Sequence, residues 1–284
     1  MNPPTTVITG TTHGIGRITA RELARAGHRV LMLVRNPTAG EQVKNEIKAQ
    51  VQGAQLEVVR CDLASLESVR AAAAQVQQQT DRIDCLINNA GIASMKAELS
   101  AEGYEKVFAT NHLGPFLLTE LLQHRMHSGA RIVNVASVAH FKGTLDLGQV
   151  SQPFSTRFRP QAVYAQSKLA NVLHTFALSR RLAPQGIAVN CLHPGVVRTN
   201  LLPRWVRIVK PLVSHHMIDA ERGARTTLYL ALDPAAARLQ GCYLDEFQQV
   251  QTASPIALDE ALQEALWTAS QRWVAAGHRP VNRP

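Results

Sequence analysis

The sequence predicts an α/β protein in which residues 1–284 form a single domain around a doubly wound parallel sheet of about seven strands, with helices on both faces. One observation is the alternation of short, continuous apolar runs, such as Val30–Val34, with longer helical stretches. Such strands are typical of a parallel sheet that is covered on both sides. A second is that no linker, repeat or low-complexity tract divides the chain. Right-handed crossovers then give a Rossmann-like architecture.

The predicted elements alternate along the whole chain. Strands are predicted at Thr6–Thr9, Arg29–Val34, Leu56–Arg60, Cys85–Asn88, Arg131–Ala136, Ala188–Leu192 and Cys242–Leu244. Helices are predicted at Ile15–Ala26, Gly40–Gln52, Leu66–Gln78, Glu102–His127, Val163–Leu182, Gly223–Leu232 and Leu258–Ala275. Gly27 and Gly53 end the first two helices, as glycine commonly does. Two segments, 140–160 and 200–221, are predicted to be irregular.

The composition excludes several classes of protein. Hydrophobic residues make up 45% and charged residues 18% of the chain, which is typical of a globular protein. No apolar run approaches the roughly 18 residues of a membrane span, and no signal-peptide pattern opens the sequence, so we expect a cytoplasmic protein without a transmembrane segment. Cys61, Cys85, Cys191 and Cys242 form no Cys-x-x-Cys pair and are interpreted as reduced, buried thiols. We expect no metal, because His215-His216 lacks partners at ligand spacing.

The net charge of +9 comes from one segment of the chain. Residues 147–218 contain no Asp or Glu, yet they contain basic residues in both irregular segments, namely Arg157, Arg159, Arg204, Arg207 and Lys210. No nucleic-acid recognition motif accompanies this charge, so a nucleic-acid partner is not expected. Three interpretations of this basic rim stay open: it attracts an anionic substrate, it contacts an anionic membrane surface peripherally, or it is merely solvated.

A Gly-rich turn, Thr9–Gly16, joins the first predicted strand to the first helix. Its glycines, Gly10, Gly14 and Gly16, allow a tight turn in which backbone N–H groups approach a pyrophosphate at the helix N-terminus. Many strand–helix turns carry glycine for backbone reasons alone. The position after the first strand nevertheless favours a dinucleotide site.

The end of the second strand indicates which dinucleotide binds. NAD sites usually carry an acidic residue there, which accepts from the ribose 2′-hydroxyl. This chain has Val34 at that position and Arg35 after it. An arginine pairs with a 2′-phosphate, and no carboxylate stands there to repel it. The alternative for Arg35 is a solvated loop charge; with the Gly-rich turn beside it, the sequence predicts NADP(H).

Six motifs in this order resemble the short-chain dehydrogenase/reductase family. They are the Gly-x-x-x-Gly-x-Gly turn, Cys61-Asp62-Leu63, Asn88-Asn89-Ala90-Gly91, Asn111-His112-Leu113-Gly114, Ser137 with Tyr164-x-x-x-Lys168, and Pro194-Gly195-Val196-Val197-Arg198-Thr199. The amino-acid sequences of residues 111–119, 137–140 and 167–173 are most similar to the retinol-dehydrogenase-like branch. The resemblance implies a cofactor site formed by Gly10, Thr12, His13, Gly14, Ile15, Gly16, Arg35, Asp62, Leu63, Asn89, Ala90, Gly91, Tyr164, Lys168, Pro194, Gly195, Val197 and Thr199.

The expected catalytic residues are Asn111, Ser137, Tyr164 and Lys168. Tyr164 and Lys168 are four residues apart and so share one helix face. A free tyrosine has a pKa near 10, and a nearby ammonium lowers it. Ser137 would stabilise charge on the substrate oxygen. The resemblance implies that Lys168 binds the nicotinamide ribose and that Asn111 holds a water that relays protons to Lys168. The sequence thus predicts an NADP(H)-dependent oxidoreductase that acts on a small carbonyl or alcohol, with Tyr164 as acid or base.

Other interpretations stay open. Taken singly, each of these residues has a structural explanation, and a catalytically silent NADP-binding regulatory or scaffold module is the main alternative function. An epimerase or dehydratase is disfavoured because the roughly 85 residues after Thr199 leave little room for a larger substrate domain. Residues 200–221 form either a mobile lid over a lipophilic substrate or an amphipathic helix that completes the core. The substrate, the direction of the reaction and a homo-oligomeric state are left undecided.

Overall fold

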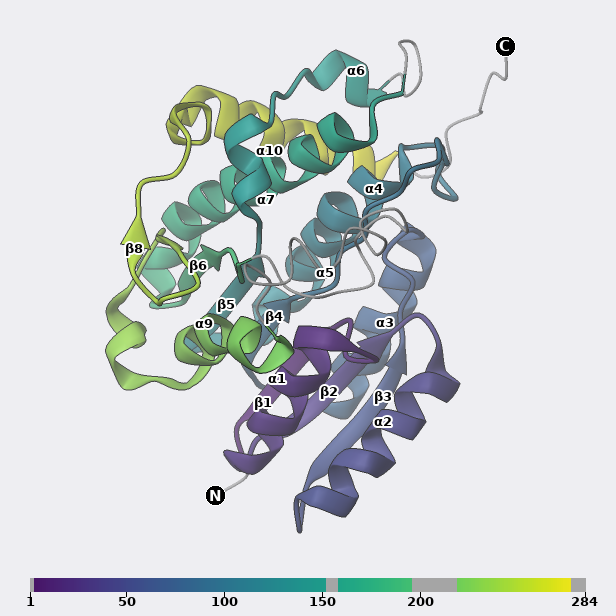
Figure 1. The fold of residues 1–284 in the computed structure, drawn as a ribbon, viewed down its shortest axis with the longest axis vertical. Coiled ribbons are helices and arrows are strands. Elements are labelled where there is room, and N and C mark those ends of the chain that lie inside the picture. The colour runs from purple at the N-terminus through teal and green to yellow at the C-terminus, as the bar shows by residue number, and fades with distance from the viewer. Residues whose placement is uncertain (1–2, 152–157, 196–218, 277–284) are drawn as a thin grey trace, which may run out of the picture.

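The structure, a computed structural model, describes residues 3–151, 158–195 and 219–276 (Figure 1). Its centre is an eight-stranded sheet in the order β3-β2-β1-β4-β5-β6-β7-β8. The strands are β1 (Thr5–Thr9), β2 (Arg29–Val34), β3 (Gln55–Arg60), β4 (Ile83–Asn88), β5 (Met126–Val135), β6 (Ala188–Leu192), β7 (Tyr243–Leu244) and β8 (Val250–Gln251). All neighbours pair in parallel except β7 and β8. The strand order reverses beside β1, and open α/β sheets bind ligands at such a point, beyond the carboxyl ends of the strands.

The helices cover both faces of the sheet, as the sequence predicts. They are α1 (Gly14–Arg25), α2 (Pro37–Gln50), α3 (Leu66–Gln79), α4 (Lys106–Phe108), α5 (Gly114–Leu122), α6 (Leu147–Ser151), α7 (Pro160–Leu182), α9 (Ala220–Leu232) and α10 (Glu260–Ala275). One apolar cluster unites side chains of α1, α2 and α9, and a larger one unites α3, α5, α7 and α10. In Figure 1, α1 and α9 lie side by side, and α10 packs along α7. The doubly wound α/β class is therefore confirmed.

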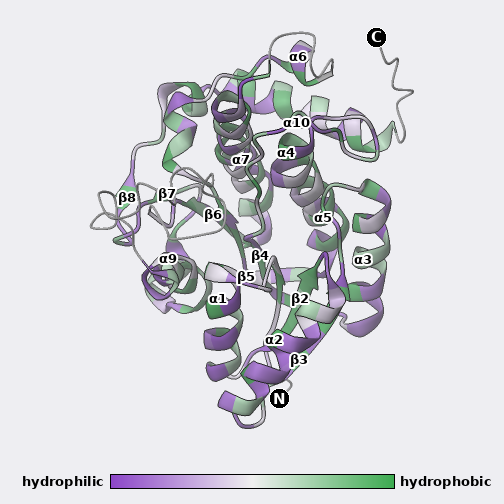
Figure 2. Cartoon of the chain, turned by 45° about the vertical axis from the view of Figure 1, so that its right-hand side comes forward, coloured by the Kyte–Doolittle hydropathy of each residue, from purple (hydrophilic) through white to green (hydrophobic). Residues whose placement is uncertain are grey.

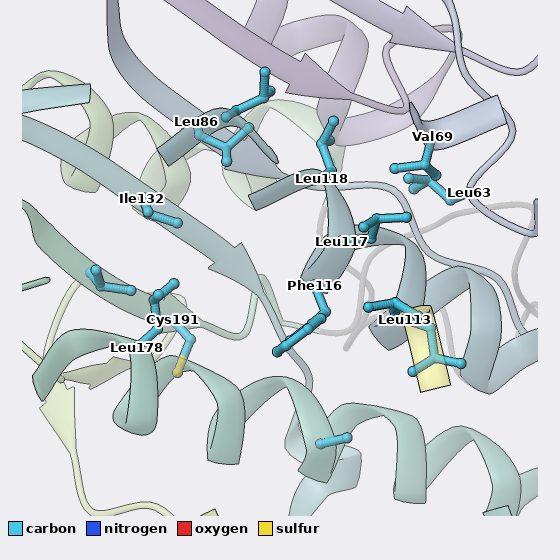
Figure 3. Packing of buried hydrophobic residues seen from close by; sticks show 14 of the residues in the cluster. Leu63, Val69, Leu86, Leu113, Phe116, Leu117, Leu118, Ile132, Leu178 and Cys191 are labelled. Atoms are coloured by element: carbon cyan, nitrogen blue, oxygen red, sulfur yellow. The ribbon is translucent and has the colours of Figure 1, made fainter. Parts of the chain in front are cut away.

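Helix α5 supplies the centre of the larger cluster. Its residues Phe116, Leu117 and Leu118, together with Leu113 of the turn before it, point toward the sheet and the neighbouring helices in Figure 3, and all are buried. The Phe116 ring meets Trp267 of α10 edge-on at a centroid distance of 5.1 Å. By contrast, α2 has only three buried residues, and hydrophilic colour covers much of it in Figure 2. The apolar α5 is therefore buried almost throughout, whereas the more polar α2 buries one side only.

The helix predicted at Glu102–His127 is wrong in its bounds and in its continuity. The chain becomes helical only at Lys106, because Glu102 and Glu105 bind backbone N–H groups with their carboxylates: Glu102 Oε1 accepts from Leu66 N at 2.6 Å, and Glu105 caps α4 at Phe108 N. A π-helical turn, Ala109–Leu113, then separates α4 from α5. Such turns occur frequently at functional sites, and this one contains Asn111. His127 belongs to β5.

Some further expectations are refined. The sheet has eight strands rather than about seven, because a turn at Asp245, whose carboxylate accepts from Phe247 N and Gln249 N, adds the short exposed strand β8. Part of the first irregular segment is helical, at Val138–Lys142 and in α6. Residues 152–157 and 200–218 lie outside the described residues, so the predicted lid is not described.

Neither a membrane-spanning helix nor a metal-binding cluster occurs in the part of the chain that the structure describes. Within residues 3–151, 158–195 and 219–276, no helix has both the length and the apolar character needed to cross a bilayer. Within the same ranges, no group of three or more His, Cys, Asp or Glu side chains is arranged to hold a metal ion.

Candidate active site

The Gly-rich turn between β1 and α1 is closed by contacts that leave no room for a side chain at Gly10 or Gly16. Gly10 has a φ of +75°, and a Cβ on Gly16 would lie 2.2 Å from Gly10 O. The Asn89 side chain, beyond β4, donates to Thr9 O at 2.9 Å and to Gly10 O at 3.2 Å. Thr9 Oγ1 accepts from the backbone N–H groups of Asn89 and Ala90, each at 3.0 Å. The turns that follow β1 and β4 are therefore locked into one unit at the point where the strand order reverses.

The N-terminus of α1 fits an anion. His13 is the N-cap residue, yet its side chain makes no capping hydrogen bond and instead has Nδ1 3.0 Å from Thr12 Oγ1. Gly14 and Ile15 form the first turn, whose N–H groups lack intrahelical acceptors. Thr11 Oγ1 is buried without a hydrogen-bond partner among the described residues. Unsatisfied N–H groups at a helix N-terminus favour a phosphate.

The neighbouring strand ends carry the residues expected at the adenosine. Val34, the last residue of β2, is buried, and Arg35 is exposed. Arg35 forms no ion pair within the described ranges, whereas Glu46 of α2 pairs with Arg17. After β3, the carboxylate of Asp62 accepts from Ala64 N at 3.0 Å, which fixes the turn. Leu63 beside it is buried. Arg35 is thus an unpaired cation at the edge of the expected nucleotide site.

Asn111, in the π-helical turn, clamps two other elements. Its side-chain amide donates to Ile92 O at 2.9 Å and to Ser167 Oγ at 3.0 Å, while its Oδ1 accepts from Ile92 N at 2.8 Å. Ser167 Oγ in turn donates to Tyr164 O at 2.7 Å. Both amide hydrogens of Asn111 are therefore engaged, so a water expected at this residue could not bind those hydrogens without displacing a protein partner.

Lys168, on α7, is almost completely buried. Its Nζ donates to Val135 O, at the end of β5, at 2.8 Å. A Cβ placed on Gly91 would lie 3.3 Å from this Nζ, so a side chain there would require the ammonium to shift by a few tenths of an ångström. Burial lowers the pKa of Lys168 to about 8, because desolvation disfavours the charged form. The lysine thus lies among the strand ends with a pKa close to neutral pH, so it can lose its proton more easily than an exposed lysine.

Tyr164 lies one helical turn before Lys168, whose Nζ is 5.9 Å from the centre of the phenol ring. A hydrogen bond joins Tyr164 to Ser137, and Ser137 Oγ also accepts from Ala139 N at 3.2 Å. Burial raises the pKa of Tyr164 above its ordinary value, and the hydrogen bond with Ser137 opposes this. The structure therefore brings Ser137, Tyr164 and Lys168 together, but in it the tyrosine pKa is raised rather than lowered.

The last predicted motif is described only in part. Pro194 and Gly195 follow β6 at the same sheet edge, and Gly195 has a φ of +79°. Val197 and Thr199 lie outside the described residues. The same is true of most of the basic rim, namely Arg157, Arg204, Arg207 and Lys210; Arg159, the N-cap of α7, is exposed.

Two histidines of this edge were not predicted as site residues. His193 Nδ1 accepts from Gly195 N at 3.2 Å, and its Nε2 lies 3.2 Å from Glu246. His140 contacts the backbone carbonyl of Ser137. The available signal was their spacing, two residues before Gly195 and three after Ser137, from which an imidazole can reach the backbone. Both act on the backbone of predicted residues.

Comparison with known proteins decides the family. The sequence profile described as "short chain dehydrogenase" matches residues 4–207. The chain belongs to the short-chain dehydrogenase family. Retinol dehydrogenase 13 from Homo sapiens is 37% identical over 281 residues, which covers 95% of this chain and 84% of that protein. The predicted likeness to the retinol-dehydrogenase-like branch is therefore confirmed.

Two solved structures share the fold of this chain. An uncharacterised protein from Mycobacterium Paratuberculosis superposes with a TM-score of 0.79 at 36% identity, covering 98% of this chain and 97% of that one. A blue fluorescent protein from a metagenomic library, solved in complex with NADPH, gives 0.70 at 27% identity over 86% of this chain and 96% of that one. Short-chain dehydrogenases bind NAD(P). Three features of the described residues fit such a dinucleotide: the close packing at Gly10 and Gly16, the N-terminus of α1 without a side-chain cap, and the Thr11 hydroxyl without a hydrogen-bond partner.

Proposed function

We propose that this short-chain dehydrogenase is an NADP(H)-dependent oxidoreductase that interconverts a carbonyl and an alcohol, with Tyr164 as the acid or base. The observation that carries the proposal is the meeting of Tyr164, Ser137 and Lys168 at the ends of the central strands. A tyrosine hydroxyl, a serine hydroxyl and an ammonium group in one place can bind a carbonyl oxygen and move a proton to it.

The residues of the dinucleotide site would divide the cofactor between them. Gly10, Thr12, His13, Gly14, Ile15 and Gly16 would hold the pyrophosphate at the N-terminus of α1. Arg35, Asp62 and Leu63 would hold the adenosine. The nicotinamide half would be held by Asn89, Ala90, Gly91, Tyr164, Lys168, Pro194, Gly195, Val197 and Thr199. The bound cofactor supplies or accepts a hydride. The arrangement follows the Rossmann rule that a pyrophosphate lies at the first helix N-terminus.

The side chains around the substrate oxygen would share the proton chemistry. During reduction Tyr164 gives its hydroxyl proton to that oxygen, and Ser137 donates a hydrogen bond that stabilises the charge developing there. A raised tyrosine pKa favours the protonated form, which is the form a proton donor needs. For oxidation the phenolate is needed, and Lys168 would lower its cost once it carries its charge. Asn111 holds the backbone at Ile92 and the helix turn at Tyr164 in place.

The preference for NADP(H) rests on Arg35. This exposed cation has no ion pair within the described ranges, and Val34 stands at the strand end where NAD sites usually carry an acid. A guanidinium forms strong charge-assisted hydrogen bonds to a phosphate. The solved relative that binds NADPH is consistent with this choice.

The similarity to a retinol dehydrogenase suggests small lipophilic alcohols and aldehydes as substrates. The positive charge of the basic rim would also suit an anionic substrate. We place residues 1–284 in one domain, and we place the protein in the cytoplasm because all four cysteines are free thiols.

The function is tested with NADPH, NADH and a panel of aldehydes and ketones that includes retinal. We expect wild-type turnover with NADPH. Tyr164→Phe keeps the ring and should keep NADPH affinity, but turnover should fall about 10²- to 10⁴-fold, as is typical when acid–base catalysis is lost. Near wild-type turnover by Tyr164→Phe contradicts the mechanism. Tight NADPH binding with no turnover across the panel would instead favour the silent regulatory module.

A further inference from the structure

We propose that His140 is a positioning residue that holds the backbone of Ser137 by bridging it to the C-terminal segment at Ser254. The proposal rests on the proposed function for its effect on turnover, but its geometry stands independently. His140 follows Ser137 by three residues, in the helical turn Val138–Lys142. Ser254 lies 114 residues further along the chain.

Both ring nitrogens of His140 are engaged with backbone groups. Nδ1 lies 2.8 Å from Ser137 O, and Nε2 lies 3.2 Å from Ser254 N. A carbonyl oxygen only accepts and a backbone N–H only donates, so the two partners fix the neutral tautomer with the hydrogen on Nδ1. The backbone N–H of His140 donates to the same Ser137 carbonyl at 3.1 Å. Ser137 O is therefore held by two donors from one residue.

The imidazole cannot easily move away from these partners. His140 is fully buried, and Ser254 is 3% exposed. The ring packs against Phe141 at 4.1 Å and edge-on against Tyr243 of β7 at 4.7 Å, measured between ring centroids. Burial lowers the pKa of His140, which favours the neutral form that this pair of hydrogen bonds requires. The contact is thus built into the core on the substrate side of the sheet.

The Ser137 backbone matters because the serine lies at the junction between β5 and the turn that follows. It adopts an extended conformation, with φ −166° and ψ 155°, and its Oγ caps the turn at Ala139 N. The same turn therefore holds both the carbonyl and the hydroxyl of Ser137, and loosening that turn would also release the hydroxyl from its place beside Tyr164. Hydrogen bonds to a reacting oxygen need precise placement, and a misplacement near 1 Å costs about 10²-fold in rate.

Two substitutions separate the two hydrogen bonds. His140→Asn places an amide nitrogen close to the position of Nδ1, so it keeps the donor to Ser137 and loses the contact with Ser254. His140→Gln places an amide oxygen close to the position of Nε2, so it keeps the acceptor for Ser254 and loses the donor to Ser137. Both substitutions remove the imidazole ring and with it the packing against Phe141 and Tyr243, so both should lower the melting temperature. Only His140→Gln should lower kcat, by about 10²-fold, with the Kd for NADPH unchanged.

A second pair tests the link to the C-terminal segment. Ser254 has a φ of −59°, which proline adopts, so Ser254→Pro removes the N–H donor with little change of φ. Ser254→Ala keeps that N–H and loses only the hydroxyl, which lies 3.4 Å from Ala257 N. Ser254→Pro should lower the melting temperature more than Ser254→Ala does and, like His140→Asn, keep kcat near that of wild type, because the donor to Ser137 O remains. A melting temperature equal to that of Ser254→Ala would show that the contact between His140 and Ser254 holds nothing in place.

A readout independent of turnover separates this proposal from the proposed function. In crystal structures, Ser137 O and Oγ should shift in His140→Gln and keep their places in His140→Asn. An unmoved Ser137 in His140→Gln overturns the proposal whatever the activity. Equal losses of kcat in both His140 variants, in proportion to their losses of stability, also overturn it, because they show a packing role alone. Absence of turnover in wild type, with Ser137 displaced in His140→Gln, counts against the proposed function and supports the positioning role.

Discussion

Arg35 is the side chain on which the proposed choice of cofactor depends. Val34 beside it is buried and faces α2, where a Cβ on Gly40 would lie 2.8 Å from Val34 Cγ2. An acid introduced at residue 34 would therefore be buried in that contact. The cleaner change is Arg35→Ala, which removes only the exposed guanidinium.

We expect Arg35→Ala to weaken NADPH binding about 10- to 100-fold, because a hydrogen bond to a charged group contributes about 1.5–3 kcal/mol. NADH, which lacks the 2′-phosphate, should bind as it does to wild type. Isothermal titration with both cofactors measures this, and Arg272→Ala on the exposed side of α10 is the control for loss of one positive charge. Equal weakening for NADPH and NADH would show that Arg35 does not contact the 2′-phosphate.

At the scale of single residues, the sequence predicts groups whose chemistry is local. Tyr164 and Lys168 share a helix face because of their spacing, and Gly16 is required by a turn that its neighbours form. The contacts of His140 could not be predicted in the same way. One of its partners lies 114 residues away, and the other is a backbone carbonyl that any residue provides.

Elements are predicted well where one periodicity runs without interruption and poorly where side chains cap the backbone. The strands at Arg29–Val34 and Ala188–Leu192 match their predicted bounds. The predicted helix at Glu102–His127 does not, since two carboxylates that look like ordinary helix residues instead cap α3 and α4. The π-helical turn around Asn111 changes the helix by a single residue, which an apolar pattern does not reveal.

The turn between β1 and α1 gives a prediction at this scale. A Cβ in Gly16→Ala would meet Gly10 O at 2.2 Å and Asn89 Nδ2 at 2.5 Å, so the locked turn must open. We expect a loss of about 1–3 kcal/mol in stability, as overpacking costs, and a weakening of NADPH binding of more than about 10-fold because the N–H groups are displaced.

The matched control is Gly27→Ala. Gly27 has a φ of +81° and nothing within 4 Å of its Cβ position, so alanine there is strained but meets no neighbour. It should cost about 1–2 kcal/mol in stability and leave NADPH affinity unchanged. If the two variants bind NADPH equally well, the tight turn is not needed for the cofactor.

At the scale of the whole molecule, helices α5, α7 and α10 meet around a pair of buried histidines. His112 and His174 lie 5.8 Å apart between ring centroids, and His174 stacks on Trp267 at 5.6 Å. His112 Nε2 contacts Ser270 Oγ at 2.8 Å, but His174 Nε2 has no hydrogen-bond partner within the described ranges. The sequence shows both residues, but not that the packing of three helices removes them from water.

This packing makes the stability of the protein sensitive to acid. Burial lowers the pKa of His174 to about 3, with a further contribution from Arg181, and burial also lowers the pKa of His112. Such a histidine stays neutral in the folded chain while it takes up a proton near pH 6.5 in the unfolded chain. Its contribution is therefore complete above pH 6.5 and is lost as the pH falls from 6.5 toward 3.

We expect His174→Phe to remove this loss, since a phenyl ring suits the site between Phe116 and Trp267 and carries no titrating nitrogen. For wild type, the shift of His174 alone should lower the free energy of unfolding at pH 5 by about 2 kcal/mol relative to pH 7.5. The variant should lose about 2 kcal/mol less than wild type over that range. It should also be about 1 kcal/mol more stable at pH 7.5, because a buried unpaired nitrogen is gone. Urea unfolding at both pH values measures this, with His124→Asn, at an exposed histidine, as the control. Equal pH dependence in His174→Phe and wild type would show that His174 is protonated in the folded protein or reached by water.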